Sequence, residues 1–122
     1  MKFFLTLAFI LISSAAFSQE TSKNFPVDYP SDLPKPKITN AYQSSKQESG
    51  TVFQFESDLS GREVLDFFAA GMAAEGYVVA NNPLYTEDNS GGSGEWIKGK
   101  NEVYILIVKA EENKTFISIT YK

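Results

Sequence analysis

Apolar and polar residues alternate along much of the chain with the period of two that is typical of half-buried β-strands. In residues 51–57, for example, Thr51, Phe53 and Phe55 fall on one side. Similar segments are separated by polar or glycine-containing turns at residues 47–50, 99–101 and 111–114. The pattern predicts strands over residues 38–46, 51–57, 77–80, 95–98, 102–110 and 115–121.

Between the second and third of these strands the period changes to that of a helix. Ser60 and Glu63 have the spacing of a capping box, which satisfies two amides at the start of a helix. Gly76 suits the left-handed conformation that often ends one. We therefore expect a helix from residue 61 to residue 75, with an apolar face made of Val64, Phe67, Phe68, Gly71 and Met72.

The order β-β-α-β-β-β predicts a protein of the α+β class. We expect an antiparallel sheet of five to six strands with one helix packed on one face. These elements form a single α+β domain over residues 37–122.

The segment ahead of this domain, residues 19–36, is a Pro-rich N-terminal arm or linker. It contains four of the five prolines and is expected to be extended. It is either a flexible tether or an arm that docks on the domain. Four large apolar residues favour at least partial docking: Phe25, Val27, Tyr29 and Leu33.

The first 18 residues, 1–18, have the features of a cleaved signal peptide. Lys2 gives a positive start, residues 3–12 are almost entirely apolar, and Ala16 and Ser18 fit the small-x-small cleavage rule. The apolar run is shorter than the roughly 20 residues that a bilayer span needs. We therefore expect cleavage after Ser18 and an exported protein, periplasmic or extracellular, without a membrane span.

One predicted strand breaks the alternation. Residues 103–108 are Val-Tyr-Ile-Leu-Ile-Val, and a continuous apolar run indicates a strand covered on both faces. One helix covers only one of them. The residues expected on the other, outer face form a candidate interaction face: Trp96, Tyr104, Leu106, Val108 and Phe116.

Three occupants would cover that outer face: the Pro-rich arm, an identical subunit or a different partner. The alternative is a face without an occupant, which stays partly exposed to solvent while its aromatic residues shield one another. Monomers rarely expose large apolar patches, which favours an occupant.

The run Thr51–Phe68, TVFQFESDLSGREVLDFF, followed by Glu75-Gly76-Tyr77, combines a strand, a capped helix with an aromatic pair, and a glycine-aromatic stop. Together with the β-meander that follows, it resembles a pattern in small, uncharacterised bacterial exported proteins and lipoproteins, over about residues 37–122. The resemblance implies the fold and export, and it implies no activity or site residue. The chain lacks the lipid-attached cysteine of the lipoprotein members.

The composition excludes several chemistries. The 122 residues include no cysteine and no histidine, so a disulfide, a thiol nucleophile, an imidazole base and an ordinary zinc site are excluded. The formal net charge is −4, and loss of Lys2 with the signal peptide makes it −5. This charge disfavours nucleic acids and anionic membranes as partners. No cofactor is expected.

The glycine-rich loop 87–95 and the acidic residues near the helix start are the remaining candidates for chemistry. Turn-forming residues favour a flexible loop. Its candidate calcium ligands, Glu87, Asp88, Asn89 and Glu95, lack the spacing of a calcium-binding loop. Acidic residues are expected at a helix start because they complement the helix dipole: Glu56, Asp58, Glu63 and Asp66.

The sequence thus predicts a non-enzymatic binding or interaction module that uses the outer sheet face. Its partner is an unknown protein or peptide, or a second copy in a homodimer. One alternative is a small enzyme or enzyme inhibitor that uses loop 87–95. Another is an envelope structural protein. No catalytic or metal-binding residue is predicted.

Overall fold

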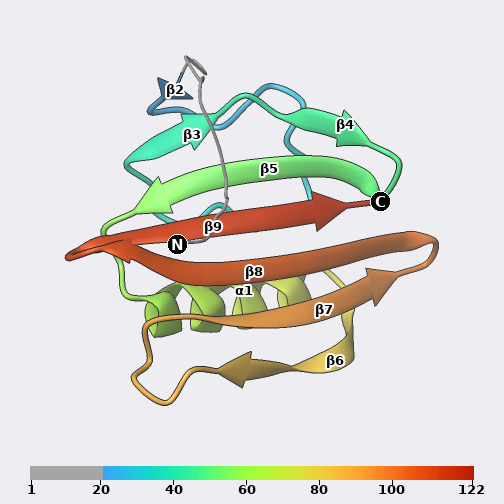
Figure 1. Ribbon diagram of the computed structural model, residues 1–122. Helices are drawn as coiled ribbons and strands as arrows, with labels where there is room; N and C mark the ends of the chain where they lie inside the picture. The colour runs from blue at the N-terminus through green and yellow to red at the C-terminus, as the bar shows by residue number, and fades with distance from the viewer. Residues whose placement is uncertain (1–20) are drawn as a thin grey trace.

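The computed structural model describes residues 21–122, which form one antiparallel sheet with one helix packed on it (Figure 1). Eight strands lie in the order β2-β3-β5-β9-β8-β7-β6, with β4 beside β5. The predicted signal peptide, residues 1–18, lies outside the described residues. The elements are β2 (Thr21–Ser22), β3 (Asn40–Tyr42), β4 (Ser45–Gln47), β5 (Gly50–Ser57), α1 (Gly61–Ala74), β6 (Val78–Tyr85), β7 (Gly92–Lys98), β8 (Asn101–Glu111) and β9 (Lys114–Tyr121).

The prediction of five to six strands is wrong, although the protein is α+β with an antiparallel sheet. The single strand predicted over residues 38–46 is replaced by two short strands, β3 and β4, which pair with different parts of β5. β3 pairs with Phe55 and Glu56, whereas β4 pairs with residues 50–52. β2 is a two-residue strand beside β3. Segments this short show too little alternation to be recognised from the sequence.

β6 and β7 are longer than predicted because turn-forming residues continue the strands. β6 includes Asn82 and Pro83, and its register with β7 shifts at two places. Such irregularities accommodate residues that do not pair, and proline is tolerated because β6 is an edge strand. The loop between the two strands is therefore limited to residues 86–91.

Helix α1 begins and ends within one residue of its predicted bounds. The Ser60 hydroxyl accepts a hydrogen bond from the Glu63 amide at 3.1 Å, and the Glu63 carboxylate accepts one from the Ser60 amide at 2.9 Å. Gly76 has a φ of +91°, and the Tyr77 amide donates to the carbonyl of Met72 at 2.9 Å. These caps satisfy backbone groups at both ends. No helix within residues 21–122 is long and apolar enough to span a bilayer.

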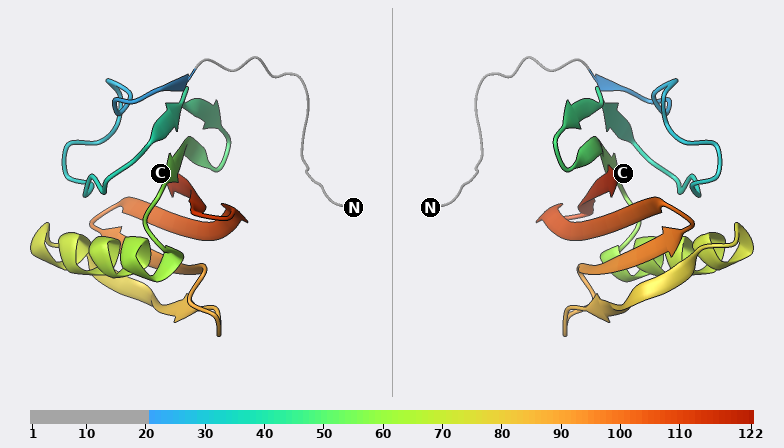
Figure 2. Two further views of the ribbon diagram at one scale, coloured as in Figure 1. Left: turned by 90° about the vertical axis from the view of Figure 1, so that its left-hand side faces the viewer. Right: turned by 90° about the vertical axis from the view of Figure 1, so that its right-hand side faces the viewer.

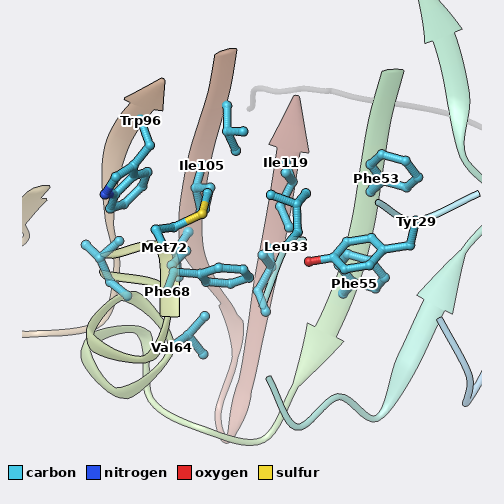
Figure 3. Close-up of a cluster of buried hydrophobic side chains, with 14 of the residues drawn as sticks. Tyr29, Leu33, Phe53, Phe55, Val64, Phe68, Met72, Trp96, Ile105 and Ile119 are labelled. Atoms are coloured by element: carbon cyan, nitrogen blue, oxygen red, sulfur yellow. The ribbon is translucent and has the colours of Figure 1, made fainter. Parts of the chain in front are cut away.

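The inner face of the sheet is covered by two elements that lie on the same side (Figure 2). Helix α1 packs against β6, β7 and β8. Beyond the helix, Tyr29 packs edge-on against Phe53 and Phe55 of β5, with ring centroids 5.3 and 5.6 Å apart. Leu33 lies between Tyr29 and the helix residue Phe68 (Figure 3). The helix and the Pro-rich segment therefore share one continuous core.

Polar contacts fix this part of the Pro-rich segment, which we call the docked arm (residues 25–34). The Tyr29 hydroxyl donates to the carbonyl of Pro34 at 2.6 Å. The Asp32 carboxylate accepts a hydrogen bond from the Tyr77 hydroxyl at 3.2 Å and forms an ion pair with Lys98 at 2.7 Å. The arm is thus joined to the end of the helix and to β7.

Truncation of Tyr29 tests how much the docked arm stabilises the fold. We expect Tyr29→Ala to lower the free energy of unfolding by about 3–4 kcal/mol, because a buried ring is lost and a cavity is left over β5. Val27→Ala is the matched control, since Val27 lies on the same arm and is fully exposed. It should change stability by less than about 0.5 kcal/mol. Urea denaturation measures both values, and a small effect of Tyr29→Ala would contradict a docked arm.

A second test concerns the contact between the arm and the helix. A Cβ atom on Gly71 would lie 2.5 Å from Cγ of Pro34. Replacing a helical glycine by alanine normally stabilises by about 0.5–1 kcal/mol, whereas overpacking costs about 1–3 kcal/mol. We therefore expect Gly71→Ala to destabilise by about 1 kcal/mol in the wild-type background.

In the Pro34→Gly background the same substitution should stabilise the protein, because the obstructing ring is absent. Thermal unfolding of the four proteins completes the double-mutant cycle. A stabilising Gly71→Ala in the wild-type background would show that Pro34 does not sit on the helix.

Candidate interaction surface

The outer face of the sheet is the face opposite α1 and the docked arm, and β8 places a row of apolar side chains on it. Tyr104 and Leu106 are each 41% exposed, and Val108 is 43% exposed. The residues between them point to the inner face and are buried: Val103, Ile105 and Ile107. The unalternating sequence of β8 therefore combines a core face with an exposed apolar face.

Phe116 extends the exposed row onto β9. It is the direct neighbour of Val108 in the register and is partly buried. Its ring centroid lies 6.4 Å from that of Tyr42 on β3. The docked arm does not cover this face, because Tyr29 and Leu33 pack on the inner one. Of the three occupants that the sequence suggests, a second copy and a different partner remain.

A polar cluster that the sequence analysis missed fixes the β3 end of the outer face. The Glu56 side chain is only 13% exposed, and its carboxylate accepts hydrogen bonds from the Tyr42 hydroxyl at 2.7 Å and the Asn40 amide at 3.0 Å. Lys114 approaches it at 3.9 Å. Burial, this hydrogen bond and the charge of Glu56 raise the pKa of Tyr42 to about 12. Only the β3–β5 register brings these residues together, so no local sequence signal reveals them.

The middle of the outer face is neutral. We call its residues the central row, because each is the direct register partner of the next across β6, β7, β8, β9 and β5. Leu106 stands in its centre with a serine on either side. Large and small side chains therefore alternate along the row: Leu84, Ser93, Leu106, Ser118 and Gln54.

Beside the central row, Tyr104 forms one wall of a shallow hollow of about 200 Å³. Thr120, the register partner of Tyr104 on β9, lines the same hollow. So does Glu95, whose carboxylate accepts a hydrogen bond from the Asn81 amide. The outer face thus offers a recess that can receive a side chain from an occupant.

Trp96, which the sequence analysis places on the outer face, lies on the inner face and is 1% exposed. Directly paired residues share a face, and Trp96 pairs with Val103. The turn between β7 and β8 contains only residues 99 and 100, since Lys98 pairs with Asn101. The predicted three-residue turn would shift the register by one residue, which moves a side chain to the opposite face.

The edges of the sheet are poorly suited to adding another strand. On one side, β6 carries Pro83 and two irregularities of register. On the other side, β2 has two residues and β4 has three. Short, irregular and proline-containing edges discourage strand addition.

The glycine-rich loop is closed by its own hydrogen bonds. The Thr86 amide donates to the carbonyl of Gly91 at 3.0 Å, and the Arg62 amide at the helix start donates to the carbonyl of Asn89 at 3.1 Å. Glu95, weighed with Asp88 as a candidate calcium ligand, lies on β7 at the outer face. Residues 21–122 contain no group of three or more acidic side chains that could hold a metal ion.

A cleft of about 340 Å³ lies between this loop, the helix start and the β8–β9 turn. Three of the nearby acidic residues have partners of their own. Asp58 forms an ion pair with Lys37 at 3.5 Å, Asp66 forms one with Arg62 at 3.7 Å, and Glu63 caps the helix. Side chains of both signs of charge line the cleft: Asp58, Glu63, Asp88, Lys109, Glu111, Glu112 and Lys114.

The pKa of Asp88 tests the order of the loop. Hydrogen bonds from the Ser90 and Thr86 hydroxyls and from the Ser90 amide lower it to about 2, from an ordinary value of 3.8. Because the folded pKa is depressed, any stabilisation by these bonds is present above pH 3.8 and is lost as the pH falls through about 2. NMR titration should give a midpoint near 2, and Thr86→Val should raise it. A midpoint near 3.8 in the wild type would show that the loop is open.

The chain was compared with protein-family models, curated proteins and solved structures, and nothing in the three comparisons matches it.

Proposed function

We propose that the protein is an exported, non-enzymatic module that binds another polypeptide through the outer face of its sheet. Export rests on the signal-peptide features of residues 1–18. Binding rests on the geometry of the outer face.

The observation that carries the proposal is the exposure of Leu106 and its neighbours at the centre of the sheet. Tyr104 and Val108 stand beside Leu106 on the same strand, with similar exposure. An antiparallel sheet with one solvent-exposed face usually carries polar residues on that face. Polar residues at these three positions would leave the core on the inner face unchanged, so folding does not require them to be apolar. Contact with another molecule gives them a role.

A polypeptide is the occupant that fits the shape and chemistry of this face. The hollow beside Tyr104 is shallow and smaller than the roughly 300–1,000 Å³ of usual small-molecule pockets. The central row is broad and neutral, and it alternates large with small side chains as the surface of a packed sheet does. Such a surface suits another protein surface.

Site-specific photo-cross-linking in cells tests the proposal. A photoreactive phenylalanine analogue at position 106 should give a cross-linked adduct, because the central row is covered in the bound state. Position 67 is the matched control, since Phe67 lies on helix α1 at the other side of the sheet and is 43% exposed. The electrophoretic mass of the adduct distinguishes a second copy from a different protein.

Absence of an adduct at position 106, or equally strong adducts at 106 and 67, would refute binding through the outer face. A Leu106→Lys variant that carries the analogue at position 104, the neighbouring outward-facing position on β8, provides a further check. It should fold normally because Leu106 lies outside the core, and it should lose the adduct.

A further inference from the structure

We infer that the occupant of the outer face is a second copy of this chain, which forms a two-fold dimer by packing outer face against outer face. The inference rests on the proposed function, because it names the partner of the same surface. Shape, charge and the form of the sheet edges each support it.

The alternation of large and small side chains on the outer face supports a second copy as its occupant. A face that packs on the central row must place small side chains over Leu106 and large ones over the serines beside it. The same row offers both kinds. A two-fold axis that lies between the two sheets, parallel to the strands and midway between β8 and β9, sets Leu106 of each copy opposite Ser118 of the other.

The same axis matches the neighbouring rows. Tyr104 comes opposite Thr120 of the second copy, because these residues are register partners on β8 and β9. The hollow lined by Thr120 is then filled by an aromatic ring. Val108 comes opposite Phe116, another register pair. Across the proposed interface, a large side chain therefore packs on a smaller one at the 106–118 and 104–120 contacts, and two apolar side chains pack together at the 108–116 contact.

Charge is the second argument. The central row contains no ionisable group, so the middle of the dimer buries no charge. Glu95 comes opposite Val52 on the flank of the contact and keeps its hydrogen bond from Asn81. Glu56 stays bound to Tyr42 and Asn40 within its own chain.

The edges are the third argument. A sheet commonly associates with another copy by adding strands edge to edge, and here both edges are short or interrupted. Two copies are therefore expected to associate through the outer faces of their sheets and not through the edges. Five strands about 4.8 Å apart and seven residues long give a face on the order of 20 Å by 20 Å. Such a face buries on the order of 800 Å² in total, which is less than in stable complexes, so we expect a weak dimer with a dissociation constant on the order of 10 µM.

The test uses the processed protein that cells accumulate from the full sequence, purified and measured by light scattering from about 1 to 300 µM, a range that spans this dissociation constant. We expect the mass to rise from that of one chain to that of two. Leu106→Glu and Ser118→Lys should each weaken association at least about 30-fold, because each buries a charge at the centre of the interface. Mixed together, the two variants should associate again, since the new glutamate of one faces the new lysine of the other.

Phe67→Glu is the matched control, because Phe67 has nearly the same exposure as Leu106 and lies on the helix. It should dimerise like the wild type. The fluorescence of the buried Trp96 and thermal unfolding verify that each variant is folded. The wild type offers a test without mutation: added salt should preserve or strengthen association, since it screens the repulsion between two negative chains around a neutral contact.

A wild-type protein that stays monomeric over this range overturns the inference. So does a mixture of the two variants that fails to associate although both are folded. Dissociation by salt would likewise overturn it. Adducts of another mass from position 106 would then still support the proposed function, so the two failures are distinguishable.

Discussion

The constraint on which the rest of the structure depends is the coverage of the inner face. A 14-residue helix is about 21 Å long, and it covers β6, β7 and β8 but leaves Phe53 and Phe55 of β5 uncovered. Tyr29 and Leu33 of the docked arm cover the part of the inner face that the helix does not reach. In a domain without disulfides, this apolar contact adds to the pairing of β9 with β5 and β8, which also joins the two halves. The absence of a side chain at Gly71, which lets Pro34 approach the helix, serves the same contact.

Coverage of the inner face by both elements explains why the outer face is open. The arm and the helix lie on the same side of the sheet, so neither shields Tyr104, Leu106 or Val108 (Figure 2). The strand β8 consequently separates two roles by residue parity. Its odd-numbered apolar positions, 103, 105 and 107, stabilise the fold, and its even-numbered positions, 104 to 108, form the surface available to a partner. Substitutions on the two faces should therefore have separable effects.

Local signals in the sequence predict the parts of the fold that depend on neighbours in the chain. Ser60, Glu63 and Gly76 identify the helix because its caps involve residues only a few positions apart. The exposed positions of β8 follow from strand parity. The prediction that Trp96 lies on the outer face is wrong, because a difference of one residue in the length of the turn after β7 changes the β7–β8 register and so the face on which Trp96 lies. The Glu56 cluster and the side on which the arm docks depend on register between distant segments, about which a single sequence carries little information.

The position of β9 has a consequence for how the protein folds. This last strand of the chain lies in the middle of the sheet, between β5 and β8, and joins the first half of the domain to the second. A chain that emerges N-terminus first from a ribosome cannot complete this sheet until residues 114–121 are free. Pairings of such long sequence separation slow folding. The part of the sheet that contains β2 to β5 and the part that contains β6 to β8 can therefore join only after residues 114–121 have paired with both.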